Sequence, residues 1–216
     1  MNHDAFANHN VSAAERHFQI RQLETPEQFE PLQPGIRELL GFYQDILADD
    51  FCDVAAENAN HPNQRLEQLT TNTRSCMPWL WIITDQAGRV LAIAALGQVT
   101  PGRHAYLHGV AHPLLLTQRC CSPALINQLA NRVLTLGFET LGLIKIKAEF
   151  EADNRGALGF CRRMGFTREA HFRQDNRVGG LLKDVVVYSL FAERFFERKK
   201  AQPALPKGHR PKPGGG

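Results

Sequence analysis

Two groups that can exchange protons occur in one short segment of the chain, residues 149–166. Glu149 stands near the end of an alternating strand pattern, and Cys161 lies in the helical pattern that follows. A carboxylate can accept a proton and a thiol can donate one, so the two groups could serve acid–base chemistry. Each also has a plainer interpretation, since Glu149 could be a solvated charge beside Lys147 and Cys161 a small buried core residue.

Two further polar side chains accompany this segment. His112 follows a predicted strand, and it is a fallback candidate for a base because an imidazole titrates near neutral pH. Asn154 precedes the helix and could be its N-cap, a ligand contact, or both. A metal site is not expected, because the adjacent Cys120 and Cys121 lack the spaced pairs that zinc requires.

Local patterns predict the elements that would carry these groups. Residues 144–150 alternate apolar and polar side chains as a strand does, and residues 155–164 read as a helix that ends at Gly165. Other strands are expected, in order, at 17–23, 79–84, 90–99, 104–111, 166–173 and 182–190, and other helices at 36–48, 63–73, from 123 onward and at 191–200. This order predicts an α/β (α+β) fold in one domain: a mixed, mostly antiparallel sheet with a central strand–helix–strand crossover and helices on both faces.

Composition and charge indicate how the chain divides into a folded domain and tails. Its 216 residues are 43% hydrophobic and 22% charged, which suits one globular domain with a core. We expect a flexible N-terminus over residues 1–16, a folded domain over 17–198, and a disordered, basic, Pro/Gly-rich tail over 199–216. The net charge of +3 comes from the tail, whose basic residues are Lys199, Lys200, Lys207, Arg210 and Lys212.

These features exclude several classes of partner. The body of the chain is near neutral, so nucleic-acid binding is not expected beyond weak contact through the tail. No apolar run approaches the roughly 20 residues that cross a bilayer, so no membrane partner is expected. The five cysteines are an odd number without paired spacing, which predicts a reducing compartment and a cytoplasmic location.

The element order and one ordered set of motifs resemble the GNAT superfamily of acyl-CoA-dependent N-acyltransferases. The chain looks most like the ribosomal-protein N-terminal acetyltransferase group, the RimI, RimJ and RimL type. The motifs that carry this resemblance are Leu141 to Ile146, then Asn154, Ala157 and Gly165-Phe166, then Lys183-Asp184 leading into Val187 to Leu190. The resemblance implies a single GNAT-like domain that moves an acetyl group from acetyl-CoA to a primary amine by direct transfer in a ternary complex.

The resemblance also implies roles for particular residues. Glu149 takes the place of the family's general base, five residues before Asn154, and Cys161 stands where the family often has a tyrosine acid. The strand that ends at Ala111 would polarise the thioester carbonyl through its backbone. The following loop and helix start would hold the cofactor pyrophosphate. The implied cofactor-binding residues are Ala111, Gln118, Arg119, Cys120, Cys121, Ser122, Pro123 and Asn154.

The chain departs from the family pattern in the cofactor loop. Cys120 and Ser122 stand where glycines are expected, although Ser122 and Arg119 could both contact phosphate. This departure leaves open an alternative in which a non-catalytic GNAT-like domain serves as an acyl-CoA sensor or a protein-binding module. For the enzyme, the implied acceptor is a small-molecule or peptide amine, such as a protein N-terminus, and the implied assembly is a monomer or homodimer.

Overall fold

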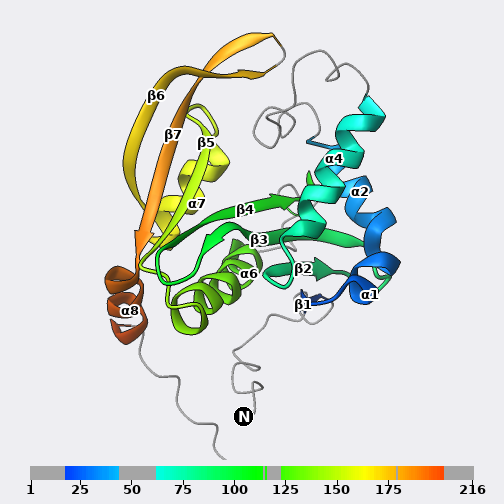
Figure 1. The fold of residues 1–216 in the computed structure, drawn as a ribbon, viewed down its shortest axis with the longest axis horizontal. Helices are drawn as coiled ribbons and strands as arrows, with labels where there is room; N and C mark the ends of the chain where they lie inside the picture. Colours follow the sequence, from blue (N-terminus) through cyan, green and yellow to red (C-terminus); the bar gives the residue numbers. More distant parts are fainter. Residues whose placement is uncertain (1–17, 44–61, 114, 116–122, 179, 202–216) are drawn as a thin grey trace, which may run out of the picture.

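The computed structural model describes residues 18–43, 62–113, 115, 123–178 and 180–201. Seven strands form one sheet, with helices on both of its faces (Figure 1). The strands are β1 (Gln19–Leu23), β2 (Leu80–Thr84), β3 (Val90–Thr100), β4 (His104–Ala111), β5 (Lys145–Glu151), β6 (Thr167–Val178) and β7 (Leu181–Phe191). The helices are α1 (Pro26–Phe29), α2 (Gln33–Gly41), α4 (Pro62–Ser75), α6 (Pro123–Thr135), α7 (Arg155–Met164) and α8 (Ala192–Ala201). A 3-10 turn, Glu30–Leu32, joins α1 to α2, and a π-helical turn, Leu136–Thr140, extends α6.

The sheet topology confirms the predicted fold class. The strand order is β1-β2-β3-β4-β5-β7-β6. Strands β4 and β5 pair in parallel, and every other neighbouring pair is antiparallel. Parallel neighbours need a crossover connection, and here α6 provides it. The chain therefore contains the expected central strand–helix–strand unit.

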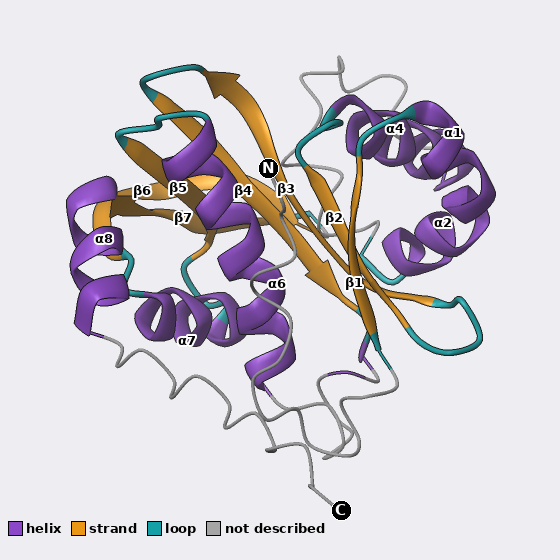
Figure 2. Ribbon diagram, turned by 90° about the horizontal axis from the view of Figure 1, so that it is seen from below, coloured by secondary structure: helices purple, strands orange, loops and turns teal. Residues whose placement is uncertain are grey.

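Two hydrophobic cores cover the two faces of the sheet. Helices α6 and α7 lie on one face, and α1, α2 and α4 lie on the other (Figure 2). The first core packs Leu129 of α6 and Met164 of α7 against β5, where Ile146 is fully buried. The second core packs Phe29 of α1 and Leu39 of α2 against β2 and β3. The burial of large apolar side chains on both faces is the main force that holds this layered arrangement together.

Strands β4 and β5 stay together over only part of their length. Their parallel register joins His104–Tyr106 to Lys145–Lys147. Strand β4 nevertheless continues to Ala111 and β5 to Glu151. Figure 1 shows the two strands turning apart, with β4 remaining beside β3 and β5 beside β7. The sheet is therefore split near its centre, and the split begins just after Tyr106 and Lys147.

Both ends of α7 are set by local interactions. The Asn154 side chain accepts a hydrogen bond from the Ala157 N–H at 3.0 Å and so caps the first turn. Gly165 has a φ of +84°, the left-handed conformation that ends a helix. The Phe166 N–H then donates to the Cys161 carbonyl at 2.9 Å. The expected bounds of this helix are confirmed because they depend on neighbours in the sequence.

We expect Gly165→Ala to lower the free energy of unfolding by about 1–2 kcal/mol, the cost of a left-handed conformation for a residue with a Cβ. The added Cβ would also lie 1.9 Å from Nη1 of Arg198, which would have to move. Gly156→Ala is the matched control, because Gly156 lies in the same helix and an added Cβ there would make only an ordinary van der Waals contact, 3.5 Å from Oδ1 of Asn154. That change should raise the free energy of unfolding by up to about 1 kcal/mol. Urea denaturation measures both, and equal effects of the same sign would contradict this prediction.

Three expected boundaries differ from those observed. Helix α2 begins earlier than expected and ends at Gly41, and residues 44–48 of the expected 36–48 helix lie outside the described residues. Strands β6 and β7 form a longer hairpin than predicted, because they keep pairing to Val178 and Leu181. Helix α8 runs over Ala192–Ala201, close to the expected 191–200, so Lys199 and Lys200, which begin the expected disordered tail, are helical. Lys199 is held there by an ion pair with Glu139, a contact between residues distant in the sequence.

The expected flexible N-terminus, residues 1–16, and residues 202–216 of the expected tail lie outside the described residues. Among the described helices, none has the length and apolar character needed to cross a membrane.

Candidate active site

The split between β4 and β5 defines the candidate site. Beyond Tyr106 and Lys147 the two strands no longer pair with each other. Backbone N–H and C=O groups along such edges need other hydrogen-bond partners. An extended ligand that carries amide groups can supply them, as a peptide does when it binds to a sheet edge. The split is therefore a suitable place for an elongated ligand with its own hydrogen-bonding groups.

Glu149 lies on β5 just past the point where the strands part. Ile146, Ala148 and Phe150 are buried on the face of β5 that packs against α6 and α7, and Glu149 is exposed on the opposite face. The regular pleat expected for this strand is thus confirmed up to Phe150, and it turns the carboxylate away from the first core. Partial desolvation raises the pKa of Glu149, the negative charge of Asp175 raises it further, and Lys147 opposes them.

A cation and two rings mark the apex of the split. The Lys147 ammonium lies 5.0 Å from the ring centroid of Tyr106 and 3.5 Å from its hydroxyl. The rings of Tyr106 and His108 stack at 6.4 Å. Val110, which follows them in the alternation of β4, packs against the second core. Glu149 therefore lies on the sheet face that α1, α2 and α4 cover.

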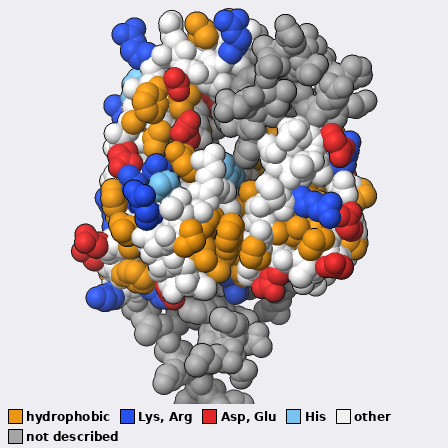
Figure 3. Space-filling view, in the orientation of Figure 1, with side chains coloured by type: hydrophobic (Ala, Val, Ile, Leu, Met, Phe, Trp, Pro, Cys, Tyr) orange, Lys and Arg blue, Asp and Glu red, His pale blue; other side chains and the backbone are white. Residues whose placement is uncertain are grey.

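His108 is a neutral group in this cluster. Burial lowers its pKa to about 4, so its imidazole carries no charge at neutral pH. In Figure 3, histidine side chains lie near the middle of the view, between the side that carries the β6–β7 hairpin in Figure 1 and the side that carries α4. The apex therefore combines one cation with uncharged aromatic surface.

The C-terminal end of β4 is clamped by the end of α2. The Tyr43 hydroxyl donates a hydrogen bond to the carbonyl of Ala111, and burial raises the pKa of Tyr43. The His112 N–H donates to the Leu91 carbonyl at 2.7 Å, and its ring packs edge-on against Phe42 at 4.7 Å. His112 is 7% exposed. His112, the predicted fallback base, is thus buried at the strand end, and its role as a base stays a prediction.

The contact of Tyr43 with Ala111 was not predicted from the sequence. Tyr43 falls within the helix expected at 36–48, and no functional role was predicted for it. Nothing local distinguishes a tyrosine that packs from one whose hydroxyl holds a strand end 68 positions away.

Cys161 is fully buried in the first core. It sits on α7 among residues that pack under β5, and burial raises the pKa of its thiol to about 12. A thiol with that pKa stays protonated near neutral pH and has no exposed surface from which to exchange a proton. These observations favour the packing interpretation of Cys161 over the acid interpretation.

Cys161 should therefore resist alkylation in the folded protein. We expect iodoacetamide at pH 8 to leave the Cys161 peptide unmodified for hours, because the thiolate is the reactive form and burial suppresses it. Peptide mass spectrometry after a pulse of reagent measures this. The control is the same pulse in 6–8 M urea (roughly the range that unfolds small domains), where the peptide should be fully labelled. Rapid labelling without urea would contradict the buried position.

The predicted cofactor residues divide into three groups. Ala111 ends β4, and Asn154 caps α7 just after the end of β5, so these two lie at the ends of the two strands that part. Pro123 is the first residue of α6 and is exposed. The remaining predicted residues lie outside the described part of the chain: Gln118, Arg119, Cys120, Cys121 and Ser122. Their role in holding an acyl donor stays a prediction.

Asp175 is a second group that the sequence interpretation missed. It lies on β6, yet its charge acts on Glu149 of β5, although β7 separates these two strands in the sheet. Asp175 lies in a bulge of β6, where the register with β7 shifts between Phe172 and Asn176. The sequence near Gln174 does not predict a bulge, because the residue with a positive φ is a glutamine and not the glycine that usually takes this conformation.

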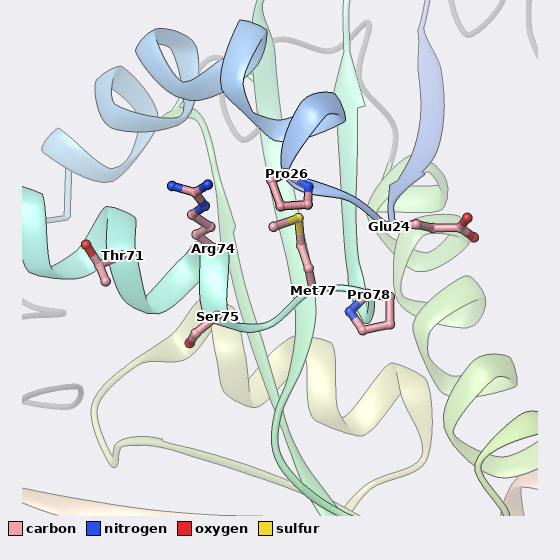
Figure 4. A pocket seen from close by; sticks show the side chains of 7 residues that line it. All are labelled: Glu24, Pro26, Thr71, Arg74, Ser75, Met77 and Pro78. Atoms are coloured by element: carbon pink, nitrogen blue, oxygen red, sulfur yellow. The ribbon is translucent and has the colours of Figure 1, made fainter.

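A separate pocket of about 470 Å³ opens between α1, α4 and the start of β2 (Figure 4). Its lining residues are Glu24, Pro26, Thr71, Arg74, Ser75, Met77 and Pro78. None of the predicted catalytic or cofactor residues that the structure describes lines it. The pocket is therefore distinct from the split between β4 and β5.

Comparison with known proteins gives a likeness of structure only. No protein-family model matches the sequence, and no curated protein matches it. A ribosomal-protein-S5-alanine acetyltransferase from Vibrio fischeri superimposes with a TM-score of 0.58 at 15% identity, over 83% of this chain and 95% of that one. A spermidine N-acetyltransferase from Vibrio cholerae, solved with CoA and spermine, gives a TM-score of 0.61 at 18% identity, over 84% and 99%. The chain therefore has the fold of GNAT acetyltransferases along nearly the whole length of these enzymes.

Proposed function

We propose that the protein is an N-acetyltransferase that moves an acetyl group from acetyl-CoA to a primary amine by direct transfer in a ternary complex. The observation that carries this proposal is the place of Glu149, exposed on β5 immediately beyond the point where β4 and β5 part. The fold is shared with acetyltransferases, one of them solved with CoA. A split sheet edge with a carboxylate beside it suits an amide-bearing acyl donor and a base.

Glu149 is the proposed general base. Its carboxylate takes a proton from the acceptor ammonium, and the free amine attacks the thioester carbonyl. The C–N bond forms and the C–S bond breaks, and the leaving thiolate takes up, through water, the proton that the attacking nitrogen loses as the amide forms. Backbone N–H groups on the free edge of β4, near Ala111, would stabilise the negative charge that develops on the carbonyl oxygen. Cys161 keeps a packing role in this proposal because it is fully buried.

The acyl donor would be held at the start of α6 and by the loop before it. Backbone N–H groups at a helix N-terminus favour bound phosphate, and α6 begins at Pro123. Arg119 and Ser122 are the proposed side-chain contacts of the pyrophosphate. Asn154 at the end of β5 is the proposed contact on the opposite side of the split.

The proposed acceptor is a small-molecule or peptide amine, including a protein N-terminus, as the RimI, RimJ and RimL resemblance implies. The names of the structural neighbours span both classes, since one is an S5-alanine enzyme and the other a spermidine enzyme. A cytoplasmic location, where acetyl-CoA is available to a monomeric or homodimeric enzyme, belongs to the same proposal.

Isothermal titration with acetyl-CoA tests the donor. We expect saturable binding of acetyl-CoA at a Kd well below about 1 mM (−4 kcal/mol of binding free energy), with CoA as the matched ligand that lacks the acetyl group. Absence of binding at millimolar concentration would overturn the proposal. A mass-spectrometric screen of peptides and small amines for acetylation then separates the enzyme from a sensor. Tight binding without transfer to any acceptor would favour the non-catalytic alternative.

A further inference from the structure

Strand β6 carries a bulge opposite a single residue of β7. Phe172 pairs with Val185 and Asn176 pairs with Lys183, so residues 173–175 of β6 stand opposite Asp184 alone. Within the bulge, Gln174 has a φ of +53°, the left-handed region that non-glycine residues avoid. A backbone in this conformation persists only where surrounding contacts hold it.

Asp184 supplies those contacts with both of its carboxylate oxygens. Oδ1 accepts a hydrogen bond from the Gln174 N–H at 2.9 Å, and Oδ2 lies 2.8 Å from Nε2 of His171. The bond from Gln174 and the contact with His171 hold the pKa of Asp184 below its ordinary value. The Asp184 carbonyl accepts from the Ala152 N–H at 2.8 Å, which ties the same residue to the end of β5. Asp184 thus links the β6 bulge to the strand that carries Glu149.

The bulge delivers two side chains to the end of β5. Asn176 donates through Nδ2 to Oε1 of Glu151 at 3.3 Å, and Glu151 is 6% exposed. Asp175, the neighbouring residue, acts on Glu149 through its negative charge. With regular antiparallel pairing from Phe172 onward, Asn176 would stand opposite Leu181 instead of Lys183, two residues further along β7 and away from Glu151.

We propose that Asp184 is a positioning residue of the candidate site: its carboxylate fixes the β6 bulge from which Asn176 bonds to Glu151, two residues along β5 from Glu149, and from which the charge of the neighbouring Asp175 reaches Glu149. The importance of Glu149 as a base rests on the proposed acetyltransferase function, whereas the geometry does not. Around Glu149, Lys147 and Glu151 flank it at two-residue spacing on β5, the uncharged Val187 pairs with it on β7, and Asp175 of β6 acts on it through its charge. On β4, Tyr106 pairs with Lys147 and stacks on His108. Among these, Asp175 raises the pKa of Glu149 and Lys147 lowers it.

Two substitutions of Asp184 separate position from charge. Asp184→Asn removes the charge but keeps an oxygen in place to accept from the Gln174 N–H. Asp184→Glu keeps the charge but moves the acceptor by one methylene group. If the position of the acceptor matters, Asp184→Glu should lower the pKa of Glu149 by about half a unit, within the range of measured carboxyl shifts, and Asp184→Asn should leave it unchanged. Asp175→Asn should lower it by at least as much, and combining it with Asp184→Glu should add nothing further.

The readout is the titration of the Glu149 side-chain carboxyl carbon by NMR in protein labelled with ¹³C-glutamate, with the signal assigned through Glu149→Gln. Asp85→Glu is the matched control, because Asp85 also accepts from backbone N–H groups, those of Ala87 and Arg89 at 2.9 Å, in a turn between β2 and β3. It should not move the Glu149 titration.

Each other outcome overturns the proposal. A shift in Asp184→Asn but not in Asp184→Glu would show that Asp184 acts through its charge alone. If the pKa of Glu149 shifts in Asp175→Asn but in neither Asp184 variant, the bulge keeps its conformation without the Asp184 carboxylate. Asp184 is a partly exposed side chain, and both changes conserve its size closely, so folded protein is expected. Since the titration needs no acceptor, a failure to find acetyl transfer would refute the proposed function and leave this test intact.

Discussion

Glu149→Gln is expected to lower kcat/KM for acetyl transfer about 100- to 10,000-fold, the usual contribution of a positioned general base. Glutamine has nearly the same size and can occupy the same exposed position on β5, but it cannot take a proton from an ammonium group. The affinity for acetyl-CoA should stay within about threefold, because the proposed role of the carboxylate is to act on the acceptor and not on the donor. Steady-state rates and titration calorimetry measure the two quantities.

The pH profile gives the sharper test of Glu149. The active form of a base is deprotonated, so kcat/KM should fall as the pH drops through the pKa of Glu149. Desolvation and the charge of Asp175 raise that pKa, so the fall should begin at a higher pH than for an ordinary glutamate. In Glu149→Gln this limb should disappear. Glu193→Gln on the exposed side of α8 is the control and should keep both rate and limb. A Glu149→Gln protein with unchanged rates across the pH range would remove Glu149 as the base.

Ile146→Ala is expected to lower the free energy of unfolding by about 2–5 kcal/mol, the range for deleting a buried aliphatic side chain and leaving a cavity. Ile146 is fully buried, and its side chain packs in the first core beside Gly137, whose added Cβ would lie only 2.7 Å from Cδ1 of Ile146. Ile146 also pairs with Ala105 in the short parallel register that joins β4 to β5. Its loss should therefore weaken the part of the sheet from which the split opens.

Ile144 provides a control of the same residue type. It lies just before β5 and is 60% exposed. Ile144→Ala should change the free energy of unfolding by no more than about 0.5 kcal/mol, as exposed substitutions usually do. Urea denaturation of the three proteins measures the difference, and the m-value should be unchanged if all unfold in two states. Similar losses for both substitutions would contradict the assignment of Ile146 to the core.

Elements whose ends depend on nearby residues could be predicted from the sequence. Helix α7 has the expected bounds because the Asn154 cap and the left-handed Gly165 act within one turn of the chain. The alternation that turns Glu149 away from Ile146 and Phe150 is likewise a local property of a pleated strand. The mixed sheet with one crossover followed from the order of such elements.

The environment of the candidate site could not be predicted in the same way. The parting of β4 and β5, the contact of Tyr43 with Ala111 and the effect of Asp175 on Glu149 all join residues that are far apart in the sequence. The sequence left Cys161 between an acid and a core residue, and its complete burial by β5, α6 and α7 favours the core. Whether a side chain such as Cys161 is buried depends on which helices and strands pack against it, and these are distant in the sequence.

The sequence by itself therefore determined the secondary elements, the fold class and the strand on which Glu149 lies, because caps, turns and hydrophobic periodicity act over a few residues. Only the tertiary structure decided that this carboxylate is exposed beside the split, which charges act on it, and that the Cys161 thiol is buried. Burial and charge interactions act through space, and their strength depends on the packing of strands that the sequence alone does not bring together.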